Sequence, residues 1–556
     1  MHVVEKVFQV AIILLCVALP PAVASAAPPM QPDLQIPIAS EVPADEVLEA
    51  NGAVIGVITI RVDDVFNLDD PREDNAVYRL TNVLHVKTHQ TVVERQLLFK
   101  SGDPFVARLL PESERILRGN EYVSDARIRA VRYENNTVDI VVAVHDVWTL
   151  TPTLSISQSG GTQSRRIGVR DTNIGGTGRA LSFIQHSTVD RTTSQLEYLD
   201  PLLFATRTRL ALDFSENTDG TTHGFSLLRP FYALDSTWSA GVSGKQDDRV
   251  DPIYDLGDIV EEFQHREDQF EVSGGWSPGL VDAATQRWSV GYRYEVDEFA
   301  PAENRLVPTL LPDNRRLSYL WVGFERITDR YKTTINQNIM GRTEDIAMGQ
   351  QLHLKLGYAN PVIGADRQSL IVNGDAGEGF ELSDGRLLFL GGALSGRREA
   401  SAWHNARLDT GLQFYQPDFG HHMFYASVDA TAVYRLDLEN QLLLGGDSGL
   451  RGYPLRYQSG EERALVTLEQ RYYTNWYPLR LARVGAAVFF DGGRVWDRDA
   501  FNSQNLGWLR DVGFGLRLSL TRSGLGSVGH IDFAFPLDGD PSIDPFQLLV
   551  GVQSTF

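Results

Sequence analysis

The clearest pattern in the chain is an alternation of apolar and polar residues near its C-terminal end. From Gly513 to Thr521, phenylalanine and leucine at even positions alternate with glycine, arginine and serine. Ala482 to Gly493, His530 to Phe535 and Phe546 to Phe556 follow similar patterns. A period of two with one apolar face predicts β-strands, either in a water-soluble sandwich or in a barrel whose outer face meets lipid.

Three observations favour the barrel. The segments have about the length, nine to eleven residues, that crosses a bilayer when tilted. Their polar face carries charges at mid-strand (Arg483, Arg517, Asp532), which a water-filled lumen allows. The last residue, Phe556, is aromatic and resembles the recognition signal of outer-membrane barrels. We therefore expect 149–556 to form an all-β transmembrane barrel, with about sixteen antiparallel strands and long outer loops.

Residues 51–148 show a different, mixed pattern. The apolar spacing predicts the order strand, helix, helix, strand, strand, with an extra helix near the start. The expected strands are Val54–Val62, Asp125–Tyr133 and Thr137–Val147, and the expected helices are Glu73–Leu84, Thr91–Phe99 and Val106–Leu117. This order, and the segment Leu97–Phe105 between the two main helices, resemble a POTRA domain. An unrelated small α+β domain is the alternative.

The N-terminal end has the composition of an export signal. Residues 1–26 contain Lys6, an apolar run and the small residues Ala24-Ser25-Ala26, which predicts a cleaved signal peptide rather than a retained anchor. Residues 27–50 are rich in proline and acidic residues and predict a linker. The only cysteine, Cys16, lies in the signal, so we expect a mature chain without disulfides or thiolate metal sites.

Charge excludes one class of function. The chain has 51 Lys and Arg against 72 Asp and Glu, a formal net charge of -21. A nucleic-acid binder needs a basic surface, so we expect no nucleic-acid partner.

The candidate functional residues lie in two C-terminal motifs. Gly445–Pro454 is a glycine-dense loop with one cation, Arg451. A buried guanidinium needs an acid, and Asp491, in Phe489–Gly493, is the best-placed candidate. Because Asp491 alternates with the apolar positions of its strand, it should face the lumen. The alternative is that Arg451 is an exposed loop residue without a partner.

These motifs are similar to those of the BamA/TamA surface-antigen superfamily of outer-membrane assembly and translocation proteins. Gly449–Tyr453 matches its [VI]-R-G-[FY] loop, except that Leu450 replaces valine or isoleucine. Phe489–Gly493 matches its F-x-D-x-G strand motif, and Gly168–Gly178 resembles its first hairpin. With the POTRA-like unit, the resemblance covers nearly all of the mature chain.

The resemblance implies a contact in the lumen between the loop and a strand of the wall. Its residues are Arg451, Gly452, Tyr453, Phe489, Asp491 and Gly493. Glu469 and Arg471 share a strand face and are candidates to extend this network. We expect no catalytic residue, cofactor or metal. Gly446–Gly449 copies a protease nucleophile signature without its wider context, and His421-His422 lacks further ligands.

The function implied is insertion or translocation of client proteins at the outer membrane. The strand Asp125–Tyr133 would capture an unfolded client by β-augmentation, and a seam between Thr151–Gln158 and the last strand would open sideways. The expected partners are unfolded outer-membrane or secreted clients, outer-membrane lipid and periplasmic proteins, with the N-terminal domain in the periplasm. The alternative is a passive outer-membrane channel or a structural surface antigen.

Overall fold

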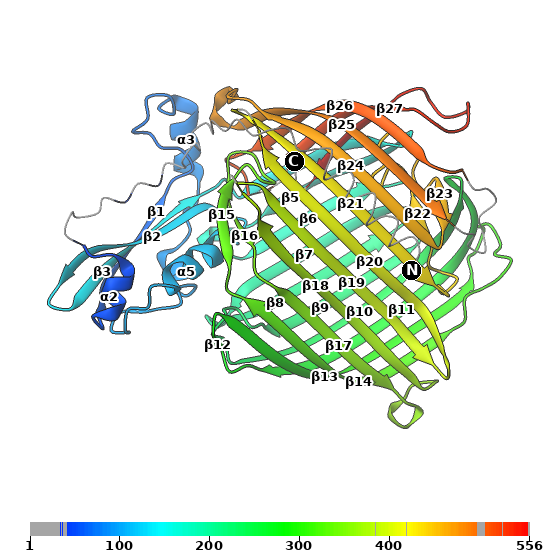
Figure 1. The fold of residues 1–556 in the computed structure, drawn as a ribbon, viewed down its shortest axis with the longest axis horizontal. Helices are drawn as coiled ribbons and strands as arrows, with labels where there is room; N and C mark the ends of the chain where they lie inside the picture. Colours follow the sequence, from blue (N-terminus) through cyan, green and yellow to red (C-terminus); the bar gives the residue numbers. More distant parts are fainter. Residues whose placement is uncertain are drawn as a thin grey trace.

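The computed structural model describes residues 34 and 36 and the ranges 42–383, 385–418, 420–496, 506–524, 526 and 528–553. The predicted signal peptide and Phe556 lie outside the described residues. Figure 1 shows a small N-terminal unit at one end of a large β-barrel. We call the barrel end beside this unit the proximal mouth and the other end the distal mouth.

The N-terminal unit is a three-stranded sheet covered by short helices. Its elements are α2 Asp45–Ala50, β1 Val54–Asp63, α3 Ala76–Leu84, α4 Gln90–Glu94, α5 Leu109–Arg118, β2 Val123–Glu134 and β3 Thr137–Asp146. β3 lies in the middle, parallel to β1 and antiparallel to β2. One core joins helices and sheet, and it includes Leu48, Val93, Leu117, Ile128 and Ile140, each at most 1% exposed.

Two elements of this unit differ from the sequence prediction. α2 forms inside the segment predicted as a linker, because Leu48 enters the core and Asp45 and Glu46 favour a helix start. α4 ends at Glu94 rather than continuing to Phe99. Leu97 and Phe99, which follow it, are still buried. The apolar spacing of this segment therefore reflects burial and does not indicate a helix.

The barrel is a single closed ring of antiparallel strands. Its strands are β4 Leu150–Ser159, β5 Thr162–Asp171, β6 Ala180–Ser187, β7 Thr192–Leu203, β8 Thr208–Asn217, β9 Gly220–Arg229, β10 Trp238–Asp255, β11 Asp258–Trp276, β13 Ala284–Pro301, β14 Arg315–Thr328, β17 Gln351–Ala359, β18 Ser369–Glu381, β19 Leu387–Glu399, β20 Ala402–Pro417, β21 His422–Tyr434, β24 Glu462–Tyr473, β25 Ala482–Trp496, β26 Leu509–Leu520, β27 Val528–Pro536 and β28 Gln547–Gln553. The two-residue β12 Leu280–Val281 adds to the edge of β13 beside β11.

The expected number of about sixteen strands is wrong, because the described residues form a ring of 20. The prediction assumed long outer loops, whereas several distal turns are very short. Gly160 and Gly161 alone join β4 to β5, and both have positive φ (55° and 78°), as a two-residue hairpin turn requires. Leu256-Gly257 joins β10 to β11 in the same way. The chain length that long loops would have needed therefore forms two more hairpins.

The two faces of the wall differ in polarity as the alternation predicts. In β26, Phe514 and Leu516 lie on the outer face and are about half exposed. Arg517, which follows Leu516, lies on the inner face and is fully buried. Large apolar side chains are exposed all around the outside, including Leu154, Ile167, Phe183, Phe214, Phe270, Val290, Leu320, Leu356, Leu390, Val488 and Phe514. Such an exterior suits bilayer hydrocarbon. No helix in the described part of the chain is long and apolar enough to cross a membrane.

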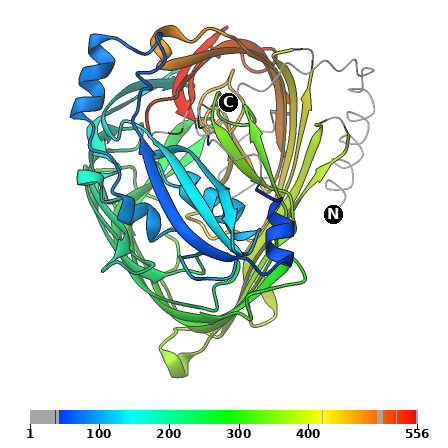
Figure 2. The same cartoon turned by 90° about the vertical axis from the view of Figure 1, so that its left-hand side faces the viewer.

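Two segments leave the wall and contribute to the interior. The lumen loop, residues 435–461, follows β21 at the distal mouth and contains the small hairpin of β22 Leu442–Leu444 and β23 Gln458–Gly460. The hairpin insert, residues 329–350, separates β14 from β17 and contains β15 Tyr331–Ile335 and β16 Thr343–Ala347. Figure 1 shows β22 and β23 at the end away from the N-terminal unit, and Figure 2 shows the N-terminal sheet in front of the proximal mouth.

A charge placed on the outer face should destabilise the barrel. Val290→Arg on β13, where the valine is 60% exposed, should lower the free energy of unfolding by about 2–4 kcal/mol, because the guanidinium would lie in hydrocarbon. Ser243→Arg is the matched control, since Ser243 borders an internal cavity of about 460 Å³. Urea unfolding of protein refolded in lipid vesicles measures both. Equal losses in the two variants would contradict the assignment of outer and inner faces.

Candidate functional site

The structure brings Arg451 and Asp491 together inside the barrel. The Nε of Arg451 donates to one Asp491 oxygen at 2.7 Å, and Nη2 donates to the other at 2.9 Å. Thr467 on β24 donates its hydroxyl to the same carboxylate at 2.8 Å. The guanidinium carbon also lies 3.4 Å from the centroid of the Phe489 ring, so the cation is held from its edge and its face.

Further charged groups surround this pair. Arg451 Nη1 donates to Glu469 at 2.8 Å and lies 3.7 Å from Asp532 on β27. Arg471 donates its Nε to the second oxygen of Glu469 at 3.0 Å. Asp532 also pairs with the buried Arg517. Together with Asp511, which is described below, these groups form what we call the arginine cluster. It consists of three guanidinium groups and four carboxylates, which belong to Arg451, Arg471, Arg517, Glu469, Asp491, Asp511 and Asp532.

Near-balance of charge is what allows so many ionised groups to be buried. Arg451 keeps 13% of its side-chain surface exposed, Glu469 keeps 6% and Asp491 keeps none. Burying a charge costs several kcal/mol unless partners replace its water. Because Glu469 binds two arginines and Arg451 binds two acids, removing either of these two residues leaves a buried charge without its partner.

The residues next to Arg451 fix the loop backbone. The N–H of Gly452 donates to Asp511 at 3.1 Å, and a Cβ on this glycine would lie 2.7 Å from the Asp511 Cβ, so only glycine fits. Tyr453 is fully buried; its hydroxyl donates to the carbonyl of Arg510 at 2.7 Å and accepts from the N–H of Asp538 at 3.2 Å. The loop is therefore attached to β26 and to the turn after β27.

The departure from the family motif, Leu450, is a packing residue. It is fully buried in an apolar cluster whose members are Leu444, Leu450, Tyr453, Tyr457, Val495 and Leu509. Gly493 makes room for it, because a Cβ there would lie 3.3 Å from a Leu450 methyl and 2.9 Å from one of Leu444. The loop thus has an apolar anchor beside its ionic one.

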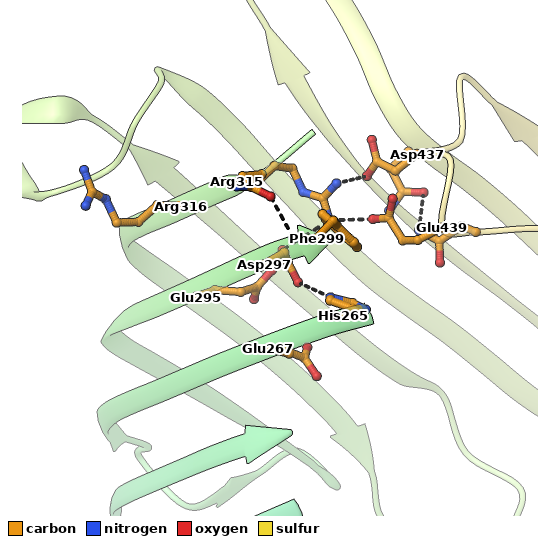
Figure 3. A network of polar contacts seen from close by, with 12 residues as sticks. His265, Glu267, Glu295, Asp297, Phe299, Arg315, Arg316, Asp437 and Glu439 are labelled. Carbon is orange, nitrogen blue, oxygen red and sulfur yellow. Dashed lines mark hydrogen bonds and ion pairs between the residues drawn. The ribbon is translucent and has the colours of Figure 1, made fainter. Parts of the chain in front are cut away.

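A second set of ion pairs holds the lumen loop at the distal mouth. Arg315 on β14 pairs with Asp297 on β13 and with Glu439 of the loop, and His265 contacts the same Asp297 at 3.2 Å (Figure 3). Arg397 on β19 pairs with Asp437 of the loop. On the other side, Arg456 of the loop binds Asp190 through two contacts of 2.7 and 2.8 Å. The loop is held from both sides of the barrel.

The hairpin insert reaches the arginine cluster from the proximal side. The Asn338 side chain lies 3.2 Å from the Tyr415 hydroxyl, and the Gln337 carbonyl lies 3.5 Å from Arg471. Arg471 stacks on Tyr425 at 4.1 Å. Met340 is 2% exposed in an apolar cluster shared with the barrel wall. Glu469 and Arg471 of β24 therefore link the lumen loop to the hairpin insert.

The same insert binds the N-terminal unit. Arg118 at the end of α5 forms two hydrogen bonds with Asp345, of 2.7 and 2.8 Å. Burial alone would lower the pKa of Arg118, but the hydrogen bonds and charge of Asp345 outweigh burial and raise it. Arg115 stacks on Tyr331 at 3.6 Å, and Arg342 donates to the carbonyl of Val123 on β2 at 2.7 Å. A continuous set of contacts thus joins α5 to Arg451.

Sequence reasoning missed three parts of this site. Asp511 was not considered, although extending the alternation of β26 by two residues from Gly513 places it on the inner face. The hairpin insert was not distinguished from the rest of 149–556, because its strands have the same period as those of the wall. The distal pairs, such as Arg315 with Glu439, join residues 124 positions apart and have no local signal.

No protein-family model and no curated protein match the sequence. Among solved structures, the chain is similar to BamA from Haemophilus ducreyi lacking POTRA domains 1–3, over 90% of this chain and 84% of that one, with a TM-score of 0.39 and 13% identity. It is similar to CdiB from Escherichia coli over 90% and 76%, with a TM-score of 0.46 and 13% identity. It is also similar to the FrpB iron transporter from Neisseria meningitidis over 91% and 94%, with a TM-score of 0.42 and 9% identity. At these scores the similarities carry no argument about function.

Removing the central guanidinium should destabilise the protein strongly. Arg451→Ala should cost about 3 kcal/mol, because Asp491 and Glu469 would be left buried without their partner. Combined with Asp491→Asn, the loss should be smaller than the sum by about 1–3 kcal/mol. Urea unfolding of the wild type, the two single variants and the double variant in detergent micelles measures these free energies.

The matched control is Arg407→Ala. Arg407 forms an equally short bidentate pair with Asp409, but the two side chains are 40% and 36% exposed. Its loss should cost less than about 1 kcal/mol. A similar cost for both arginines, or no coupling between Arg451 and Asp491, would contradict a buried ionic contact.

Breaking the contact between insert and N-terminal unit should loosen the insert. Asp345→Asn should increase the rate of tryptic cleavage within 329–350 about tenfold, since a charge-assisted hydrogen bond contributes about 1.5–3 kcal/mol. Glu134→Gln, which disrupts an exposed pair with Arg132, should leave the rate unchanged. Equal rates in both variants would rule out this docking role.

Proposed function

We propose that this protein inserts or translocates client proteins at the outer membrane, through a sideways opening between β4 and β28. The N-terminal unit would then lie in the periplasm and act as the POTRA-like receiving domain. The proposal rests on the motif resemblance and on one structural observation, the weak closure of the ring where its first and last strands meet.

The closure between β4 and β28 consists of one register pair, Val550 with Gln158, in the described part of the chain. By comparison, β27 and β28 share seven register pairs, and β4 and β5 share ten. Each pair in a ladder contributes backbone hydrogen bonds, so this junction is the easiest place to separate two strands. An opened junction offers two unpaired edges to an incoming strand.

The lumen loop is placed to control this junction because it contacts both sides of it. On the β4 side, the Ser159 hydroxyl donates to the Gly446 carbonyl at 3.2 Å. Gly160 lies so close to the loop that a Cβ would come within 2.4 Å of the Leu455 nitrogen. On the other side of the junction, Gly452 binds Asp511 on β26, and Arg451 lies 3.7 Å from Asp532 on β27, the strand next to β28. Loss of the arginine cluster would free the loop that bridges the two sides.

Client capture at β2 requires a narrower site than the sequence suggested. β2 lies at the edge of its sheet, but the first half of that edge is occupied. Arg118 donates to the Ala126 carbonyl, and Glu114 accepts from the Ile128 N–H at 2.7 Å. We therefore place β-augmentation at the end of β2 from Ala130 to Glu134. Binding there would act next to α5, whose Arg118 holds the hairpin insert.

A passive channel is less well supported, because the lumen loop and the hairpin insert both enter the lumen and are linked there through Glu469 and Arg471 of β24. A steady wide conductance in planar bilayers would favour the channel.

Locking the junction tests the proposal. Gln158→Cys with Val550→Cys should form a disulfide between β4 and β28, in a chain whose only natural cysteine is Cys16 in the predicted signal. Under oxidation, reconstituted protein should lose insertion of a β-barrel client, and a reductant should restore it.

The control pair is Ile531→Cys with Val550→Cys, which joins β27 to β28 away from the junction. It should leave insertion unchanged under oxidation. Full activity in the locked junction variant would exclude a sideways opening, while equal loss in both variants would indicate a general effect of cross-linking.

A further inference from the structure

A cationic cavity lies at the proximal mouth, where the N-terminal unit, the hairpin insert and the turns of β24–β25 and β26–β27 meet. Its volume is about 240 Å³. Five arginines line it, against two carboxylates, Glu73 and Asp125. The arginines are Arg72, Arg342, Arg480, Arg483 and Arg522. This excess of positive charge contrasts with the net charge of -21 of the whole chain.

Some of these arginines are compensated within the protein. Arg522 pairs with Glu73, and Arg480 lies 3.5 Å from Asp70, which also binds Arg72 at 2.7 Å. The other carboxylate, Asp125, is used elsewhere, since Arg118 and Arg127 lie 3.8 and 3.6 Å from it.

Two arginines form no close ion pair among the described residues, although the charges of Glu344, Glu121 and Asp125 act on one of them, Arg342. Arg342 donates to the Val123 carbonyl, and burial lowers its pKa. Arg483 stacks on the Tyr477 ring at 4.0 Å, and its buried Nε has no hydrogen-bond partner in the part of the chain described here. Both arginines line the cavity, and Arg483 Nε lies 3.3 Å from the position of a Cβ on Gly341, the residue before Arg342.

Neutral donors in the same cavity also lack partners. The hydroxyls of Ser519 (1% exposed) and Thr343 (7% exposed) are buried and make no hydrogen bond to any residue in the described ranges. Both residues line the cavity. A buried donor without an acceptor costs about 1–3 kcal/mol, and a buried charge without a counter-charge costs more. One cavity is thus lined by two guanidinium groups that form no ion pair and by two hydroxyls that make no hydrogen bond among the described residues, which suits an anion with several acceptor oxygens.

We propose that this cavity binds a phosphate group. A phosphate offers three or four acceptor oxygens and up to two negative charges, which suit the two arginines that form no ion pair and the two hydroxyls that line the same cavity. The phosphate group comes either from free inorganic phosphate or from the headgroup of an anionic phospholipid at the membrane surface beside the mouth. The bound anion holds the tip of the hairpin insert against β25 and β26. This inference does not depend on the proposed function.

Calorimetric titration of the full-length protein in a phosphate-free detergent with inorganic phosphate tests the site. We expect saturable binding that weakens about tenfold or more in Arg483→Gln, because one charge-assisted contact is lost. Arg342→Gln should show the same loss. Arg510→Gln is the matched control, since Arg510 is exposed, pairs with Asp538 and lies at the opposite end of β26. Heat-modifiable migration on gels reports whether each variant is folded.

A second arm separates the two sources of phosphate. Protein is reconstituted in phosphatidylethanolamine vesicles with and without phosphatidylglycerol, and the affinity for inorganic phosphate is measured again. A headgroup ligand predicts that phosphatidylglycerol weakens phosphate binding in the wild type, and free phosphate as the ligand predicts no change. Absence of saturable phosphate binding in detergent, or equal affinity in wild type and folded Arg483→Gln, would overturn the proposal.

Discussion

The structure depends on one interaction, a guanidinium delivered from a loop and held by carboxylates of the barrel wall. Arg451 binds Asp491 through both carboxylate oxygens and Glu469 through a third contact. Because these groups are buried, the loop position is determined by charge rather than by shape alone. The lumen loop then joins strands that are far apart around the ring, from β4 to β14 and β27.

The same cluster connects the two inserted segments. Glu469 is shared by Arg451 of the lumen loop and by Arg471, which contacts the hairpin insert. The insert in turn binds α5 through Asp345. An event at the N-terminal unit therefore has a physical route to the loop that bridges the weak closure. The contacts between successive segments of that route are hydrogen bonds and ion pairs, and Met340 of the insert also packs against the wall.

Much of this could be predicted from sequence because the deciding signals are local. Alternation in β25 and β26 indicated which side chains face inward, and together with the two C-terminal motifs it led to the prediction that Asp491 meets Arg451. Gly452 shows why this loop needs a glycine, because its backbone lies so close to Asp511 that there is no space for a side chain. Leu450, which stands where the [VI]-R-G-[FY] motif has valine or isoleucine, is apolar and fully buried.

What could not be predicted depends on contacts between distant residues. Strand number depends on how short the turns are, and alternation does not distinguish a wall strand from the strands of the hairpin insert. The cationic cavity combines Arg342, Arg483 and Ser519 from three separate segments, and no local signal indicates that these segments meet. The edge of β2 is covered by Glu114 and Arg118, whose helical spacing indicates only which face of α5 is buried.

The central claim is that the carboxylate of Asp491 holds the lumen loop in place. Hydrogen exchange of the backbone amides of 445–457, compared between wild type and Asp491→Asn in lipid vesicles, tests it most directly. The account predicts slow exchange in the wild type and clearly faster exchange in the variant, with the amides of β7 to β9 unchanged. Equal protection of the loop in both proteins would contradict it.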